Sequence, residues 1–185
     1  MEREEALVLL HQYVKNPRTI SHCLASEAVM RKMAERLGED PELWGLAGLL
    51  HDLDVEITMG NMQQHTLETA KILQQYNVGN DVIDAILVHN EHASHQLPRT
   101  AKLHHALACS ETITGLITAT AMVYPDKKVG SVKPKSVVKR MKEKAFAASV
   151  SREAIMECET IGVQLDEFVA LSLEAMQQIS EQLGL

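Results

Sequence analysis

The stretch Leu43–Asp54, which reads LWGLAGLLHDLD, decides how this chain of 185 residues folds. An apolar run rich in leucine, alanine and glycine ends in the pair His51-Asp52. A buried carboxylate is costly unless it is paired or bound to a metal. Neighbouring helical side chains point about 100° apart, so this pair converges only on a point close to the backbone. A metal ion satisfies that condition, and the pair therefore predicts a metal site inside a helical protein.

Other histidines and one acid recur at intervals along the chain, each on a separate predicted helix. The apolar segment ALACSETITGLITATAMV contains an acid near its centre, and such a residue needs a partner. First-row divalent metals accept imidazole nitrogen and carboxylate oxygen, so we expect one or two ions of Fe, Mn, Ni, Co or Zn. The predicted ligands of one ion are His22, His51, Asp52 and Glu111, and those of a second are His65 and His89, with Asp52 bridging.

Composition favours an all-α fold in one domain. Hydrophobic residues make up 45% of the chain, but aromatic residues only 3%, which suits packed helices better than a sheet sandwich. We expect one domain over residues 1–185 with a core at about 20–123. There is no 18-residue apolar run and no signal peptide, so neither a membrane span nor membrane association is predicted. The three cysteines are widely spaced and form no CxxC, which indicates a reduced, cytoplasmic compartment.

Helical periodicity and capping residues place the elements. Helices are predicted over 4–15, from about 19 to 38, over 41–51, 61–76 and 80–90, and from about 100 to 123, the last being apolar on most faces and therefore central. Asp40 before Pro41 is typical of a helix start. Ser151 and Asp166 are predicted to cap the two final helices.

A basic segment stands out in an acidic chain. The net charge is −7, yet residues 127–144 contain eight lysines and arginines and one acid. The overall charge should repel a long nucleic acid, whereas a local basic patch can hold a small phosphate group. Lys127, Lys128 and Lys135 are the candidates for phosphate binding, and the segment 124–185 is a candidate cover for the site. A solvated loop and helix face is an equally good interpretation of the same charges.

Some histidines are left outside the predicted ligand set. His92 and His95 lie in or beside a predicted loop and are candidates for the entrance of the site. His104 lies two turns before Glu111 on the same helical face and is the strongest rival for a place among the ligands.

These residues and their order resemble the HD-domain superfamily of metal-dependent phosphohydrolases, in particular the small bacterial stand-alone proteins of the HDIG type. The resemblance rests on His22, on LAGLLHD ending at His51-Asp52, on His65 and His89, and on Glu111 in ETITGLI, and it covers about residues 20–120. It implies an all-α bundle with a central metal site. The implied activity is hydrolysis of a small, nucleotide-like phosphomonoester or phosphodiester by metal-activated water, with His51 and Asp52 as catalytic residues.

Two departures from the family pattern leave alternatives open. The last ligand of the family is usually Asp, whereas Glu111 stands here, and the Lys of HDxGK-type phosphodiesterases is replaced by Val55. These departures favour a catalytically weak or silent module that binds metal or nucleotide in a regulatory role. A third interpretation is di-iron oxygen chemistry. The apolar helices also leave a homodimer open.

Overall fold

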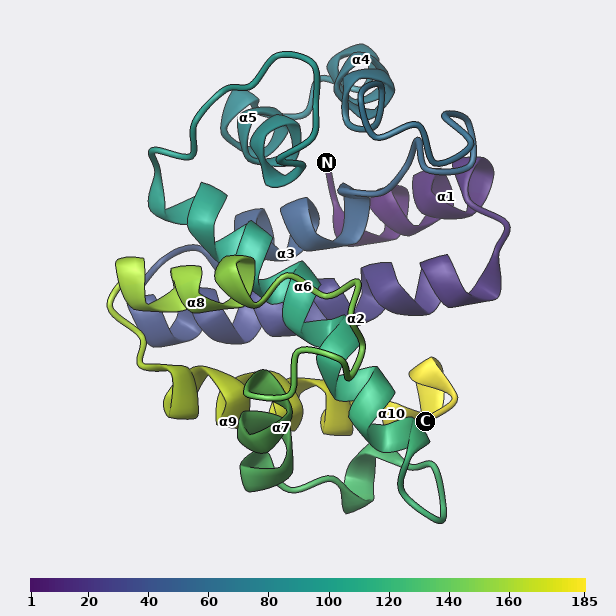
Figure 1. Ribbon diagram of the computed structural model, residues 1–185. Helices are drawn as coiled ribbons and strands as arrows, with labels where there is room; N and C mark the ends of the chain where they lie inside the picture. Colours follow the sequence, from purple (N-terminus) through teal and green to yellow (C-terminus); the bar gives the residue numbers. More distant parts are fainter.

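A computed structural model describes residues 1–185 in full and contains helices but no strands. This confirms the expected all-α fold class. Figure 1 shows the elements, with labels on the α-helices. They are α1 (Arg3–Tyr13), α2 (Pro17–Leu37), α3 (Pro41–Leu50), α4 (Leu67–Gln75), α5 (Asn80–His89), α6 (Lys102–Met122), the short 3-10 helix η1 (Val129–Ser131), α7 (Pro134–Met141), α8 (Arg152–Thr160), α9 (Leu165–Gln178) and α10 (Ser180–Leu183).

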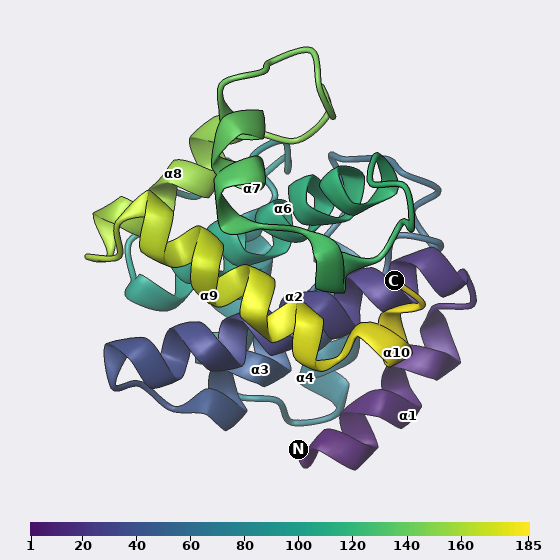
Figure 2. The ribbon, with the colours of Figure 1, turned by 90° about the horizontal axis from the view of Figure 1, so that it is seen from below.

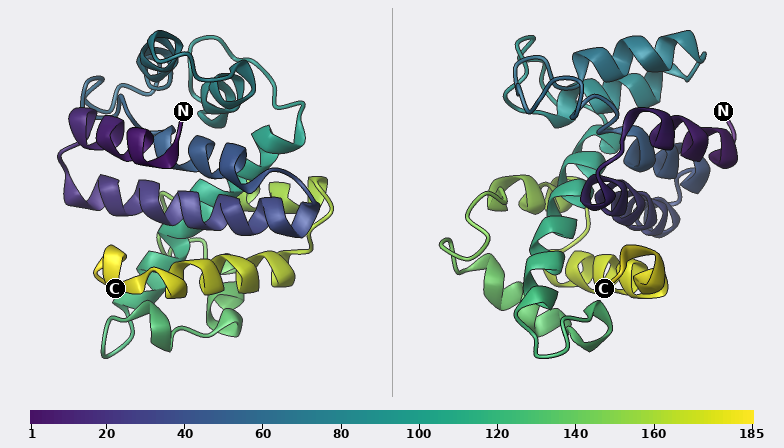
Figure 3. Two further views of the ribbon diagram at one scale, coloured as in Figure 1. Left: turned by 180° about the vertical axis from the view of Figure 1, so that it is seen from behind. Right: turned by 90° about the vertical axis from the view of Figure 1, so that its right-hand side faces the viewer.

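Helix α6 is the centre of the fold, as its apolar sequence predicts. It contacts α2, α3, α5, α7, α8 and α9, and Figure 1 shows it crossing α2 with α4 and α5 towards one end and α7 and α10 towards the other. Seen from behind, α1, α2 and α9 run as successive rows across the molecule (Figure 3). A helix surrounded in this way can carry a polar residue only where neighbouring helices supply partners.

Close packing of α2 against α3 brings the first two histidines together. A Cβ atom added to Gly48 of α3 would lie 2.7 Å from the carbonyl oxygen of Ser26 in α2. Only glycine therefore allows this approach of the two backbones. Because Ser26 is one turn beyond His22, and His51 is one turn beyond Gly48, the approach also brings the two imidazoles together, edge-on, with their ring centroids 4.9 Å apart.

Capping residues explain most of the helix boundaries. The Asp40 carboxylate accepts hydrogen bonds from the backbone N–H groups of Glu42 and Leu43, and the Ser151 hydroxyl accepts one from Ala154. Both predicted starts are confirmed. The prediction for Asp166 is wrong, because α9 begins at Leu165 with Gln164 as its N-cap.

The predicted helix over 61–76 begins later than expected. Residues 62–66 form turns, and α4 starts only at Leu67, after Thr66 with a positive φ of 84°. The carboxylate of Asp54, fully buried, accepts hydrogen bonds from the N–H groups of Thr66 and Thr69 at 2.8 and 3.0 Å. A buried acid distant in sequence thus caps α4 and fixes where that helix begins.

The chain after α7 returns to α6. Val150, just before α8, lies 3.4 Å from where a Cβ of Gly115 would stand on α6. Figure 2 shows α7, α8 and α9 gathered on one side of the molecule. None of the helices combines the length and the apolar character needed to traverse a bilayer.

Candidate metal centre

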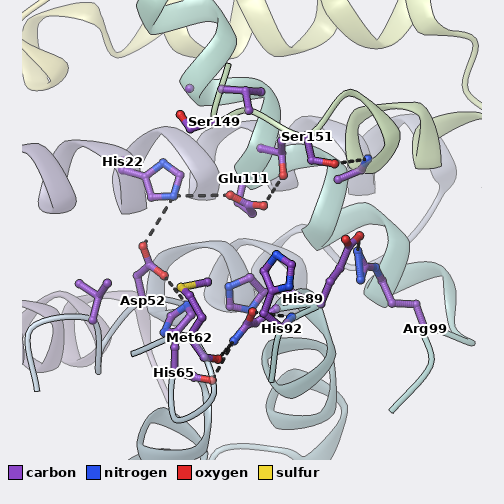
Figure 4. A pocket seen from close by; sticks show the side chains of 17 residues that line it. His22, Asp52, Met62, His65, His89, His92, Arg99, Glu111, Ser149 and Ser151 are labelled. Carbon is purple, nitrogen blue, oxygen red and sulfur yellow. Dashed lines mark hydrogen bonds and ion pairs between the residues drawn. The ribbon is translucent and has the colours of Figure 1, made fainter. Parts of the chain in front are cut away.

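Six side chains from five parts of the chain meet near the middle of α6. His22 comes from α2, and His51 and Asp52 come from the end of α3. His65 lies just before α4, His89 is the last residue of α5, and Glu111 is on α6. Figure 4 shows His22 and Glu111 on one side of the pocket, facing Asp52, His65 and His89 on the other. The structure therefore brings together every residue that the sequence proposes as a metal ligand.

The ligand atoms form two groups that share Asp52. The donor atoms of His22, His51 and Asp52 lie within 4.8 Å of one another, and so do those of Asp52, His65 and His89. Asp52 turns Oδ2 towards His22 Nε2 at 3.7 Å and Oδ1 towards His65 Nε2 at 3.2 Å. A carboxylate placed in this way can contribute one oxygen to each of two ions.

Glu111 lies beside the first of the two groups, on the side of His22, but is not among the donors that all lie within 4.8 Å of one another. Its Oε2 lies 3.8 Å from His22 Nε2. The Thr112 hydroxyl donates a hydrogen bond to Oε1, which leaves Oε2 directed at the centre.

Hydrogen bonds on the outer nitrogen fix the tautomer of each imidazole. The Nδ1 atoms of His51 and His89 lie 2.8 and 2.7 Å from the carbonyl oxygens of Gly48 and Ile86. A carbonyl cannot donate, so Nδ1 carries the hydrogen and Nε2 presents a lone pair. The Thr114 hydroxyl donates to the carbonyl of Glu111 and therefore accepts from Nδ1 of His22.

The consequence is an arrangement that suits a cation. The Nε2 atoms of His22 and His51 lie 3.1 Å apart, and in the neutral tautomers fixed above neither has a hydrogen to place between them. Two lone pairs at that distance repel unless a positive charge lies between or beside them. Metal-binding histidines also donate the hydrogen of the other ring nitrogen to a carbonyl, carboxylate or water. This donor set fits a first-row divalent ion.

His65 is held by two carboxylates. Its Nδ1 donates to Asp54 Oδ1 at 2.6 Å, while its Nε2 faces Asp52. Burial lowers the pKa of His65, but the bonds to Asp52 and Asp54 outweigh it and raise the value to about 9. In the metal-free chain a proton therefore occupies the position on Nε2 that an ion would take.

Burial and neighbouring charges set the other ionisation states. Burial, together with His51, lowers the pKa of His22 to about 4, and burial lowers the pKa of His89 well below its usual value. Burial would raise the pKa of Asp52, but the surrounding histidines hold it well below its usual range. Burial raises the pKa of Glu111 to about 8.

The centre opens into a pocket of about 370 Å³. Arg99, only 10% exposed, is the permanently charged cation on its wall. The guanidinium is held by Glu157 of α8, by the Val88 carbonyl and by Glu91, which is half exposed. The wall also includes His92, Asn90, Thr112, Ser149, Val150, Ser151 and Ala154. The predicted contribution of residues after 124 to the site thus comes from the start of α8 and the segment before it.

The lysines proposed for phosphate binding lie elsewhere. Lys127 and Lys128 are exposed in the loop after α6, and Lys135 is exposed on α7; none of the three lines the pocket. The alternative interpretation of the basic segment, a solvated loop and helix face, fits their positions. Their charges are concentrated in sequence, but they come after the C-terminal end of α6, whereas Glu111 lies near the middle of that helix.

The remaining histidines have other partners. His92 lines the pocket, as proposed for an entrance residue, whereas His95 bonds to the Leu87 carbonyl. His104 accepts hydrogen bonds from the N–H groups of Thr100 and Ala101 and so helps cap α6.

Two further residues escaped the sequence interpretation. Asp54 was visible only as a second acid after the HD pair, and its bonds to His65 and α4 depend on a loop whose path cannot be read from periodicity. Arg99 follows Pro98 in a loop with no pattern that marks it. No sequence signal separates this arginine from an exposed one.

Comparison with known proteins finds relatives over most of the chain. The chain is 26% identical over 162 residues to ribonuclease Y of Sulfurovum sp. (strain NBC37-1), which is 88% of this chain and 32% of that protein. It is 30% identical over 153 residues to ribonuclease Y of Aquifex aeolicus (strain VF5), 82% of this chain and 27% of the relative. The chain therefore spans only about a third of the length of these relatives. No solved structure matches significantly.

The family model described as HD domain matches residues 19–121, more than half of the chain. The matched segment contains all six converging side chains, from His22 to Glu111. The chain therefore belongs to the HD-domain family.

Proposed function

We propose that the protein is a metal-dependent phosphohydrolase that acts on a small, nucleotide-like phosphoester through two divalent ions. The observation that carries the proposal is the pair of donor groups sharing Asp52, in which His22, His51 and His89 have hydrogen-free Nε2 atoms. HD domains are associated with metal-dependent phosphohydrolysis, and the donor set supports that chemistry here. Bound divalent ions would supply charge neutralisation for the phosphoryl oxygens and an activated water.

The residues of the chain supply position and charge. His22, His51 and Glu111 would hold one ion, and His65 and His89 the other, and Asp52 would serve as a ligand in both groups. Asp54 keeps His65 in the tautomer that binds metal. Arg99 would attract the phosphate: the exposed Glu91 can swing into solvent and leave part of the guanidinium for a substrate oxygen.

The charge of the chain and the relatives favour a short substrate with a diester bond. The net charge of −7 disfavours a long polyanion on the surface, and the pocket of about 370 Å³ is at the small end of ligand sites. The relatives are ribonucleases by name, which supports a phosphodiester as the bond that is cut. Each of those proteins is much longer than this chain, so contacts to a long RNA can come from parts that this chain does not match.

A metal-reconstitution assay tests the proposal. Purified protein is stripped with a chelator, reloaded with Mn²⁺, Fe²⁺, Co²⁺, Ni²⁺ or Zn²⁺, and assayed with a chromogenic phosphomonoester and phosphodiester. Hydrolysis that depends on metal and falls at least 100-fold in Asp52→Asn supports it, and Asp84→Asn, an exposed acid on α5, is the matched control. No turnover with any metal, combined with tight nucleotide binding, would instead support the regulatory module. Activity that requires iron and dioxygen would support the oxygenase.

A further inference from the structure

A second, larger cavity of about 750 Å³ adjoins the metal centre. It shares His22 and Gly115 with the first pocket, so the two cavities meet beside the ligand His22. A phosphomonoester needs space on one side of the reacting phosphate only. Here there is space on both sides of His22, so a second group attached to the phosphate has room to bind.

Two helix faces form the walls of this second cavity, which we call the α2–α6 groove. On α6, Gly115, Thr118, Ala119 and Met122 follow Glu111 at intervals of one turn, and all four line the groove. On α2 the lining residues that share the face of His22 are Arg18, Ser21 and Ala25. Met176 of α9 and Leu183 of α10 also line the groove. The same faces that present the ligands His22 and Glu111 therefore continue as the groove.

The lining is suited to an uncharged group that has both apolar and hydroxyl surface. Arg18, which is exposed, is the one permanently charged side chain on it, while the first pocket contains the fixed cation Arg99. Ser21 and Thr118 offer hydroxyls, and Ala25, Ala119 and Met122 offer apolar surface. A nucleoside has a flat apolar base and a sugar with hydroxyl groups, and the groove volume lies in the range of ligand sites.

We propose that the α2–α6 groove binds the nucleoside of a phosphodiester whose phosphate lies at the metal centre. The inference rests on the proposed function and adds the substrate class and the site that selects it. Water adds its oxygen to phosphorus, and the P–O bond on the side of the first pocket breaks. The departing oxygen keeps the bonding electron pair and takes up a proton, while the nucleotide in the groove retains the phosphate.

The test uses a variant that narrows the groove and leaves every proposed metal-binding residue unchanged. Ala119→Phe places a large ring in the groove from a half-buried position, and Ala170→Phe makes the same change at an exposed position of α9 outside it. Two substrates with the same chromophore are compared, p-nitrophenyl phosphate and thymidine 5′-(p-nitrophenyl phosphate). We expect Ala119→Phe to lower the ratio of kcat/KM for the thymidine diester to that for the monoester at least tenfold. The ratio should stay within twofold in Ala170→Phe.

A binding measurement separates failure of the groove from failure of the hydrolase. Thymidine 5′-monophosphate is titrated calorimetrically into the metal-loaded protein, and Ala119→Phe should weaken its affinity at least fivefold. If neither substrate is hydrolysed, the proposed function is contradicted, while this titration still tests the groove. Thr118→Leu serves as a second groove variant, and thermal melts establish that each variant is folded. The inference would be overturned if folded groove variants kept the wild-type ratio of kcat/KM values and the wild-type affinity for thymidine 5′-monophosphate. It would also be overturned if kcat/KM fell equally for both substrates.

Discussion

Replacing Asp54 with Asn should remove the second metal ion without unfolding the protein. The Asp54 carboxylate is fully buried, and its Oδ2 accepts hydrogen bonds from the N–H groups of Thr66 and Thr69. The Asn side chain can keep those two bonds only by directing its carbonyl oxygen at them. Its NH₂ group then faces Nδ1 of His65, which must become an acceptor. The ring hydrogen moves to Nε2, and His65 loses the lone pair that binds metal.

The contacts of Asp54 set the expected loss of stability and the expected loss of metal affinity. Hydrogen bonds to a charged acceptor contribute about 1.5–3 kcal/mol each, and neutral ones about half as much. Neutralising the acceptor of Thr66 and Thr69 should therefore lower the free energy of unfolding by about 2 kcal/mol. Loss of the acceptor that hydrogen-bonds to a metal-binding histidine typically weakens metal affinity about 10- to 100-fold. Asp54→Ala leaves buried donors unpaired and should cost more than about 3 kcal/mol.

The assay measures metal content and stability together. The wild type, Asp54→Asn and the exposed control Asp84→Asn are dialysed against limiting free Mn²⁺, and bound metal is counted by mass spectrometry. Urea unfolding in chelator gives the free energy. We expect two ions per chain in the wild type and the control and one in Asp54→Asn. Two ions held with wild-type affinity in Asp54→Asn would refute the tautomer argument.

Three further outcomes follow from the same contacts. Gly48→Ala forces a methyl group into the backbone of α2 and should lower the free energy of unfolding by about 1–3 kcal/mol; a wild-type urea midpoint would contradict the close approach. The pKa values of His65 and Glu111 are raised by folding to about 9 and about 8, so their protons stabilise the metal-free fold and are lost as pH rises. Urea unfolding in chelator should show stability falling between about pH 6.5 and 9, and a flat or rising profile would argue against these assignments. Arg99→Gln should raise KM about tenfold for a phosphoester, whereas Lys128→Ala should leave it unchanged, because only the arginine lines the pocket; the reverse ranking would return phosphate binding to the basic segment.

Much of the fold and the set of side chains that converge was predictable, because helix boundaries and buried faces depend on local sequence. Helical periodicity and caps such as Asp40 place α3 and α6, and the order of His22, His51-Asp52, His65, His89 and Glu111 identifies the residues that converge. Periodicity reports which face of a helix is buried, and a ligand on that face points to the interior.

The features that escaped prediction depend on contacts between distant segments. The later start of α4 is set by Asp54, which lies 12 residues before Thr66 in a loop without periodicity. The position of Arg99 follows from Glu157 on α8, 58 residues away. The lysines of the basic segment do not line the pocket, because charge density in sequence carries no information about where the chain runs after α6.

A crystal structure of the protein grown with Mn²⁺, with anomalous diffraction recorded, tests the central claim most directly. We predict two anomalous peaks, one on each side of the Asp52 carboxylate. One should lie against Nε2 of His22 and His51 and the other against Nε2 of His65 and His89. Peaks only at surface carboxylates, or an Asp52 carboxylate with no metal beside it, would contradict the account.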